Sequence, residues 1–120
     1  MHLLLISLLS FFLSHTGWET DFQKASEQAH KEHKLILLNF SGSDWCGPCI
    51  RLKKEIFEAK EFDTFAEQCL VLVNADFPRL KKNQLSKEQT KRNDSLADKY
   101  NAEGVFPLTL LLNSDGKVIK

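Results

Sequence analysis

The sequence predicts an α/β layered domain in which helices flank a central mixed sheet. Short, nearly uninterrupted apolar runs at 35–40, 70–76 and 105–112 are typical of strands buried on both faces. The segments between them repeat apolar residues at helical intervals. The order helix, strand, helix, strand, helix, strand, strand predicts parallel early strands and a final hairpin. A chain of 120 residues with 42% hydrophobic residues has room for one such domain.

The first helix is expected over residues 21–31. Thr20 and Gln23 have the spacing of a capping box, and the apolar residues that follow recur at helical intervals. This helix should cover the strand at 35–40.

The second helix should begin at about Cys46, because Pro48 is acceptable only in the first turn of a helix. Apolar residues then follow the i, i+3, i+4, i+7 rule, with basic residues on the outer side. A short helical piece at 62–69 leads into the strand at 70–76. Cys69, where the two meet, is interpreted as a small core hydrophobe.

Residues 77–92, "FPRLKKNQLSKEQTKR", predict a polar surface excursion with a little helix after Ser86. Their basic residues are interpreted as a solvated face rather than a substrate contact. A separate helical unit is expected at 94–100, ended by Gly104. The strand at 105–112 is followed by the turn "NSDG" and by "KVIK", the start of a returning antiparallel strand. The sequence stops inside that strand and leaves one face of the sheet without an obvious C-terminal helix to cover it. We expect that either the protein continues past Lys120 or the domain is incomplete on that side.

Residues 1–17 contain no charged side chain, and 3–13 is an apolar run too short to span a bilayer. This pattern favours a secretory signal peptide followed by a domain over 18–120. Against it, the usual Lys or Arg at the start is absent, and only His2 and the terminal amine are available. The alternatives are an uncleaved N-terminal anchor, which would bring membrane contact, and a buried strand. We expect a periplasmic or otherwise extracytoplasmic protein.

Charge and cysteine content exclude two classes of protein. Lys plus Arg and Asp plus Glu number 16 each, so no net field attracts nucleic acid or anionic lipid. Three cysteines cannot all pair within one chain, which excludes a disulfide scaffold. An oxidising compartment would still let one pair form.

Cys46 and Cys49 are the candidate reactive pair. A helix N-terminus stabilises a thiolate, and in Cys-X-X-Cys pairs the pKa can fall to roughly 3.5–7.5 from about 8.5. Cys46 stands at the expected helix start, and Cys49 lies one turn further, near enough to close a disulfide. The pair can attack a substrate disulfide through Cys46, and Cys49 can then displace the reduced product.

Two other interpretations of the pair are weaker. A metal site needs further ligands, and after export only His30 and His33 remain, both preceding the pair. A purely structural disulfide closing so small a ring would stabilise little.

Several motifs resemble the thioredoxin superfamily over residues 18–120. They are "WCGPC" followed by an amphipathic helix, "VNAD" ending the next strand, and "VFPLTLLL" followed by "SDGKV". The opening "FSGSDWCGPC" and the long polar insert resemble exported bacterial thioredoxin-like proteins. The resemblance implies a thioredoxin fold in which Cys46 attacks and Cys49 resolves, with Gly47 and Pro48 completing the active-site motif.

The resemblance also implies that Pro107 is the cis-proline beside the active site. Without the resemblance, Pro107 would be taken as a trans residue ending a loop. A cis-proline turn exposes the backbone of Phe106 to an extended substrate strand, and Phe106 and Trp45 would form an apolar rim.

The expected function is therefore thiol–disulfide exchange with protein substrates, in the reductase or isomerase direction. No dissociable cofactor and no metal is expected, so electrons must pass to or from another redox protein. The alternative is a non-catalytic module: a metal carrier using Cys46 and Cys49, or a chaperone whose rim around Phe106 holds unfolded chains.

Two positions depart from the family pattern. The family's buried acid before the active site is replaced by Asn39, and its Lys on the following strand by Leu72. An amide cannot accept a proton from Cys49, so we expect slow resolution of mixed disulfides unless another acid or a water substitutes. Alternatively, Asn39 is a satisfied core amide and resolution proceeds by solvent access.

Overall fold

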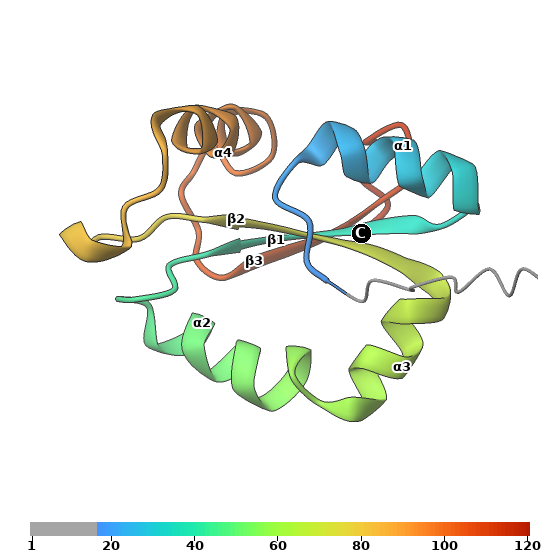
Figure 1. The fold of residues 1–120 in the computed structure, drawn as a ribbon, viewed down its shortest axis with the longest axis horizontal. Coiled ribbons are helices and arrows are strands. Elements are labelled where there is room, and N and C mark those ends of the chain that lie inside the picture. Colours follow the sequence, from blue (N-terminus) through green and yellow to red (C-terminus); the bar gives the residue numbers. More distant parts are fainter. Residues whose placement is uncertain (1–16) are drawn as a thin grey trace, which may run out of the picture.

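The structure is a computed structural model and describes residues 17–120. The expected signal peptide or anchor therefore lies outside the described residues, apart from Gly17. The main elements are α1 (Phe22–Glu32), β1 (Leu35–Ser41), α2 (Gly47–Leu52), α3 (Lys60–Cys69), β2 (Leu70–Asp76), α4 (Lys87–Tyr100) and β3 (Leu108–Leu112). Helices α1 and α4 lie on one face of the sheet, and α2 and α3 lie on the other (Figure 1).

The sheet has the order β2-β1-β3, with β1 parallel to β2 and antiparallel to β3. This confirms the predicted mixed sheet. Asn39, at the centre, stands opposite Asn74 on one side and Thr109 on the other. Asn39 and Ser41 of β1 and Asn74 and Asp76 of β2 line one pocket with residues of α2, so these polar positions share the face that α2 covers.

The ends of the predicted third and fourth strands differ from expectation. β3 begins at Leu108 rather than at 105, and Pro107 before it has no N–H for a ladder bond. The returning segment forms a bridge between Leu112 and Val118, and Leu111 exchanges backbone hydrogen bonds with Ile119 and Lys120. It is a bridge rather than a full strand, and within residues 17–120 no helix follows β3.

Helix α1 is capped by Asp21 rather than by Thr20. The Asp21 carboxylate accepts hydrogen bonds from the backbone N–H groups of Gln23 (3.0 Å) and Lys24 (3.3 Å), which have no partner inside the helix. Asp is a stronger cap than Thr, so the helix begins one residue later than a Thr20 cap would place it. The helix buries two alanines in a core to which all three strands also contribute. The members of this core are Ala25, Ala29, Ile36, Leu38, Phe40, Val71, Val73, Ala75 and Leu112.

Helix α2 continues without a break into a π-helical turn, Lys53–Phe57, and α3 follows. On α3, Ala66 is buried but Phe65 and Cys69 are exposed. The prediction that Cys69 is a core residue is therefore wrong. Phe65 and Cys69, four residues apart, form a row beside the one that Ala66 presents to the sheet.

Helix α4 joins the two helical pieces predicted after Ser86 into one helix of 14 residues. The Ser86 hydroxyl caps it by accepting from the backbone N–H of Gln89 at 3.1 Å. The apolar period is interrupted because Asn93 is buried, and its amide donates to the Asp76 carbonyl at 2.9 Å. Among the described residues, no helix is long and apolar enough to cross a membrane.

Candidate active site

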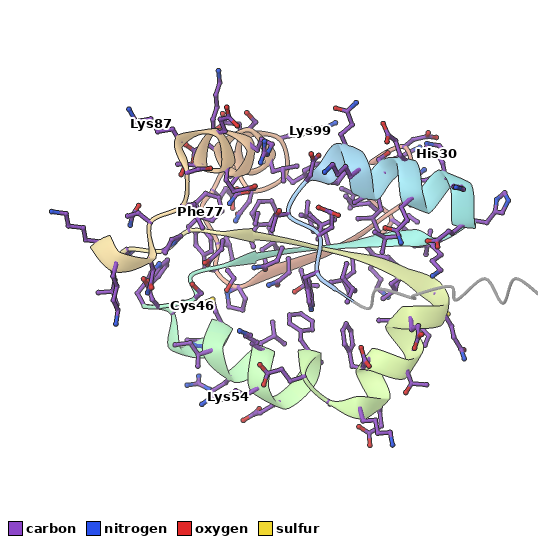
Figure 2. All side chains as sticks on the ribbon, viewed as in Figure 1. His30, Cys46, Lys54, Phe77, Lys87 and Lys99 are labelled. Carbon is purple, nitrogen blue, oxygen red and sulfur yellow. A yellow bond between two sulfur atoms is a disulfide. The ribbon has the colours of Figure 1, made fainter. Side chains whose placement is uncertain are left out.

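The cysteine pair lies at the start of α2, as predicted. Cys46 is the N-cap residue, and it forms a disulfide with Cys49 across a Cα–Cα distance of 5.2 Å. Both side chains are buried in this oxidised form, at 5% and 4% exposure, whereas Gly47 and Pro48 between them are exposed. The pair therefore lies beneath the exposed Gly47 and Pro48, and Figure 2 labels Cys46 at the start of α2.

The two sulfur atoms have different surroundings. Cys46 Sγ accepts a hydrogen bond from the backbone N–H of Cys49 at 3.2 Å, at the positive end of the helix. Cys49 Sγ faces inward and accepts from the backbone N–H of Gly42 at 3.5 Å. A negative charge that forms on Cys46 after reduction would meet the helix N-terminus, whereas Cys49 faces the sheet.

The predicted rim residues come together beside the pair. The Phe106–Pro107 peptide bond is cis, as the resemblance implied. The rings of Trp45 and Phe106 meet edge to face at 5.5 Å, and Phe106 meets Phe77 in the same way at 5.4 Å. The Trp45 indole N–H donates to the Phe77 carbonyl at 2.7 Å, which fixes the ring. Trp45, Phe106 and Pro107 are each half-buried.

Gly42 allows the Trp45 ring to lie against the active-site loop. A Cβ atom at Gly42 would overlap the six-membered ring and Nε1 of Trp45. Sequence analysis missed this residue because a glycine in a loop has many explanations. The contact depends on a ring that only the folded chain brings there.

Asp44 ties the segment after β2 to the active-site loop. Its carboxylate accepts from the backbone N–H groups of Arg79 and Leu80, both at 2.9 Å, and from the Asn83 amide at 3.1 Å. The hydrogen bond from Arg79 is the main reason that the pKa of Asp44 lies below its ordinary value. The Arg79 guanidinium lies over the Trp45 ring, 3.6 Å from its centroid. The segment interpreted as a solvated excursion thus borders the site.

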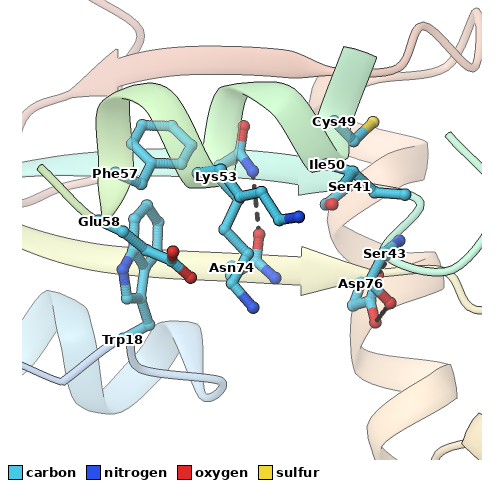
Figure 3. A pocket seen from close by; sticks show the side chains of 12 residues that line it. Trp18, Ser41, Ser43, Cys49, Ile50, Lys53, Phe57, Glu58, Asn74 and Asp76 are labelled. Carbon is cyan, nitrogen blue, oxygen red and sulfur yellow. Dashed lines mark hydrogen bonds between the residues drawn. The ribbon is translucent and has the colours of Figure 1, made fainter. Parts of the chain in front are cut away.

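A pocket of about 650 Å³ lies behind Cys49, between the helix and the sheet. Its lining residues are Trp18, Asn39, Ser41, Ser43, Cys49, Ile50, Lys53, Lys54, Phe57, Glu58, Asn74 and Asp76. Figure 3 shows Cys49 and Lys53 on the helix and Asn74 and Asp76 on β2 across from them. The inward side of Cys49 therefore opens onto a space lined by both polar and aromatic side chains.

Asn39 is a buried and satisfied amide in the floor of this pocket. Its nitrogen donates to Asn74 Oδ1 at 3.0 Å, and its oxygen accepts from the Thr109 hydroxyl at 2.8 Å. Leu72 is buried on the next strand. These positions hold no titrating group, as the sequence indicated.

Other ionisable side chains nevertheless line the same pocket. They are Lys53, Lys54, Glu58 and Asp76, which the sequence did not connect with Cys49. Both carboxylate oxygens of Asp76 accept from Ser43, one from its N–H at 2.9 Å and one from its hydroxyl at 2.6 Å. In residues 17–120 no three His, Cys, Asp or Glu side chains are grouped so that they could hold a metal ion.

A cysteine pair at a helix start, a parallel β1–β2 pair and an antiparallel β3 preceded by a cis-proline are the features of a thioredoxin fold. Residues 17–114 match the thioredoxin-like domain family, and the chain belongs to this family.

The chain is similar to proteins of disulfide metabolism. It is 38% identical over 100 residues to a Chlamydia pneumoniae protein named disulfide bond reductase DsbH, covering 83% of this chain and 58% of that protein. The chain thus spans less than two thirds of this relative. A solved structure titled DsbH oxidoreductase superposes with a TM-score of 0.78 at 36% identity, covering 87% of this chain and 69% of that one. A solved structure of a disulphide isomerase from Xylella fastidiosa superposes with a TM-score of 0.61 at 25% identity, covering 82% of this chain and 67% of that one.

Proposed function

We propose that this protein is a thiol–disulfide oxidoreductase that acts on protein substrates, with Cys46 as the attacking thiol and Cys49 as the resolving thiol. The observation that carries the proposal is the position of the Cys46–Cys49 disulfide, at the start of α2 and beneath the exposed Gly47 and Pro48. The names of its relatives, a disulfide bond reductase and a disulphide isomerase, support the same class of activity.

The first step is an attack by the reduced enzyme. The Cys46 thiolate attacks one sulfur of a substrate disulfide, a mixed disulfide forms, and the other substrate sulfur leaves as a thiolate that takes up a proton. The Cys49 N–H, 3.2 Å from Cys46 Sγ, supports the role of Cys46 because it favours negative charge there.

The second step releases the substrate. The Cys49 thiolate attacks Cys46 Sγ, the Cys46–Cys49 disulfide forms, and the second substrate sulfur leaves as a thiolate. Two electrons have then moved from the enzyme to the substrate. Because the second step leaves Cys46 and Cys49 joined as a disulfide, a reductase of this kind needs another redox protein to return two electrons.

The half-buried rim of Trp45, Phe106 and Pro107 would hold the substrate. The Phe106 backbone can pair with an extended segment next to Cys46, and the two aromatic rings offer an apolar contact. Gly47 and Pro48, exposed between the cysteines, leave the approach to Cys46 open. We place this activity outside the cytoplasm, on the uncharged apolar pattern of residues 1–17.

Two cysteine variants test the proposal. With a dye-labelled protein disulfide as substrate, Cys46→Ser should abolish reduction, and Cys49→Ser should accumulate a mixed disulfide on Cys46 that mass spectrometry identifies. Cys69→Ser is the control and should reduce the substrate at the wild-type rate, because Cys69 is exposed at the end of α3. Turnover that survives Cys46→Ser would overturn the assignment of Cys46 as the attacking thiol. A wild-type protein that reduced no substrate would overturn the proposed activity. Holding of unfolded chains that survives Cys46→Ser would then favour a chaperone, and a metal content that drops in Cys46→Ser would favour a metal carrier.

The direction of exchange follows from the reduction potential of the pair in defined thiol buffers. A value near roughly −270 mV would group the protein with reductases, and one between about −180 and −120 mV would favour isomerase or oxidant work.

A further inference from the structure

We propose that Arg79, Lys81 and Lys82, here called the basic loop, select substrates whose target disulfide is flanked by acidic residues. The inference rests on the proposed function, because it assigns a substrate class to the same site. It concerns charges that the disulfide chemistry itself does not use.

The basic loop concentrates positive charge in a chain whose net charge is zero. Three cations occur within four residues, whereas the whole sequence has a formal net charge of +0. All three side chains are exposed. The ion pairs found within residues 17–120 are His30–Asp115 and Lys34–Glu32, so none of the three cations is neutralised there. Their charge is available to a partner.

The loop adjoins the substrate rim rather than a distant surface. The Arg79 guanidinium lies 3.6 Å from the centroid of the Trp45 ring, and the same ring meets Phe106 at its edge. A cation over an indole face gains from the charge distribution of the ring. Arg79 thus extends the apolar rim by a positive group, and a bound substrate would meet both.

The basic loop is held in place by hydrogen bonds that do not involve its charged side-chain groups. The Asp44 carboxylate accepts from the backbone N–H groups of Arg79 and Leu80, not from the guanidinium. Asn83 joins the same carboxylate, and the Gln84 amide donates to the Pro78 carbonyl at 3.0 Å. A loop whose backbone is already fixed pays a smaller ordering cost when a substrate binds its cations.

A substrate carboxylate beside the disulfide would therefore meet Arg79 at the rim, and a longer acidic segment would also reach Lys81 and Lys82. Exposed charges at the edge of an interface act mainly on the association rate and on its salt dependence. A flexible acidic segment of a polypeptide suits this position, because the same partner must place its disulfide at Cys46. An anionic membrane surface could meet the loop but would not reach the cysteine pair.

Two peptides test the inference. They share one disulfide and differ only in the flanking residues, four Glu in one and four Gln in the other. At low ionic strength the wild-type protein should reduce the acidic peptide with a kcat/KM about tenfold higher, and added NaCl should shrink the difference. The combined change Arg79→Gln, Lys81→Gln and Lys82→Gln should bring the ratio close to one.

Matched variants separate charge selection from other effects. Removing three exposed cations from helices α1 and α4, Lys24→Gln, Lys91→Gln and Lys99→Gln, should leave the ratio unchanged. The pair Lys81→Gln and Lys82→Gln keeps Arg79 on the Trp45 ring and should lose part of the preference.

Each contrary result has a distinct meaning. Equal reduction of both peptides by the wild type would overturn the inference and leave the proposed function standing. A wild-type protein that bound anionic vesicles through the basic loop, and showed no peptide preference, would identify a membrane-contact surface instead. If neither peptide were reduced, the proposed function itself would fail.

Discussion

The backbone N–H of Cys49 donates a hydrogen bond to Cys46 Sγ at 3.2 Å, across the first turn of α2. When the disulfide is reduced, this N–H and the helix N-terminus can stabilise negative charge on Cys46. Cys49 Sγ also accepts a backbone N–H, from Gly42 at 3.5 Å, but it faces inward and does not lie at the helix N-terminus. The helix start thus distinguishes two sulfur atoms that are buried to nearly the same degree.

We expect the reduced protein to react with iodoacetamide at Cys46 down to a pH well below the value of roughly 8.5 for a free thiol. The pH at which the rate falls to half reports the stabilisation of the thiolate, and peptide mapping assigns the site. In Cys46→Ser this low-pH reaction should be absent. Its persistence in that variant would assign the reactive thiol to another cysteine.

Gly42→Ala should displace the Trp45 ring, because the added Cβ would overlap it. Overpacking of this kind costs about 1–3 kcal/mol, which urea unfolding would measure as a loss of stability. Trp45 fluorescence, recorded in a Trp18→Phe background, should shift, and kcat/KM for a protein disulfide should fall. The control for stability and for Trp45 fluorescence is Gly47→Ala, whose Cβ would meet only Arg51 Nη1 at an ordinary 3.6 Å. Equal stability and equal fluorescence of the two variants would show that the Trp45 contact does not shape the active-site loop.

Asp44→Ala should release the segment after β2 from the active-site loop. The backbone N–H groups of Arg79 and Leu80 lose their acceptor, so their hydrogen exchange should accelerate. Asp98→Ala, which removes an exposed carboxylate on α4, is the control and should leave both amides protected. Slow exchange in Asp44→Ala would mean that other contacts hold the segment.

The hydrogen bonds between Asp44 and the segment after β2 should also depend on pH in the wild type. The hydrogen bond from the Arg79 backbone is the main cause that lowers the pKa of Asp44 below its ordinary value of 3.8. The ionised carboxylate therefore stabilises the fold fully at pH values above 3.8. This stabilisation is lost as the pH falls through the lower pKa of the folded state. Protection of the Arg79 amide should follow the same course in the wild type and be absent at every pH in Asp44→Ala.

The sequence alone predicted that the cysteine pair stands at a helix start, and it predicted the main elements, because both depend on local patterns. An apolar run defines β1, Pro48 requires a helix start nearby, and Cys46 and Cys49 follow from their spacing. The cis conformation at Pro107 came from the family resemblance. The prediction that Cys69 is buried was wrong because it depended on which face of a short helix meets the sheet.

What the sequence could not locate depends on contacts between distant segments. Asp44 and Arg79 are 35 positions apart, and only the parallel pairing of β1 and β2 places their loops side by side. Asn93 is buried in α4 because it reaches the carbonyl of Asp76. A polar residue in a polar helix gives no local signal of such a bond.

Asn39→Asp tests whether the missing buried acid limits turnover. The new carboxylate would line the same pocket as Cys49 and could accept its proton, so the mixed disulfide of Cys46 should resolve faster in a single-turnover assay. The change also removes the amide that donates to Asn74 Oδ1, so the folded state should lose about 1–3 kcal/mol. Asn39→Leu removes the same donor without adding an acid, and it is the control for the loss of stability. A resolution rate unchanged by Asn39→Asp would indicate that Cys49 is deprotonated through the pocket by other groups, of which Asp76, Glu58 and solvent are the candidates.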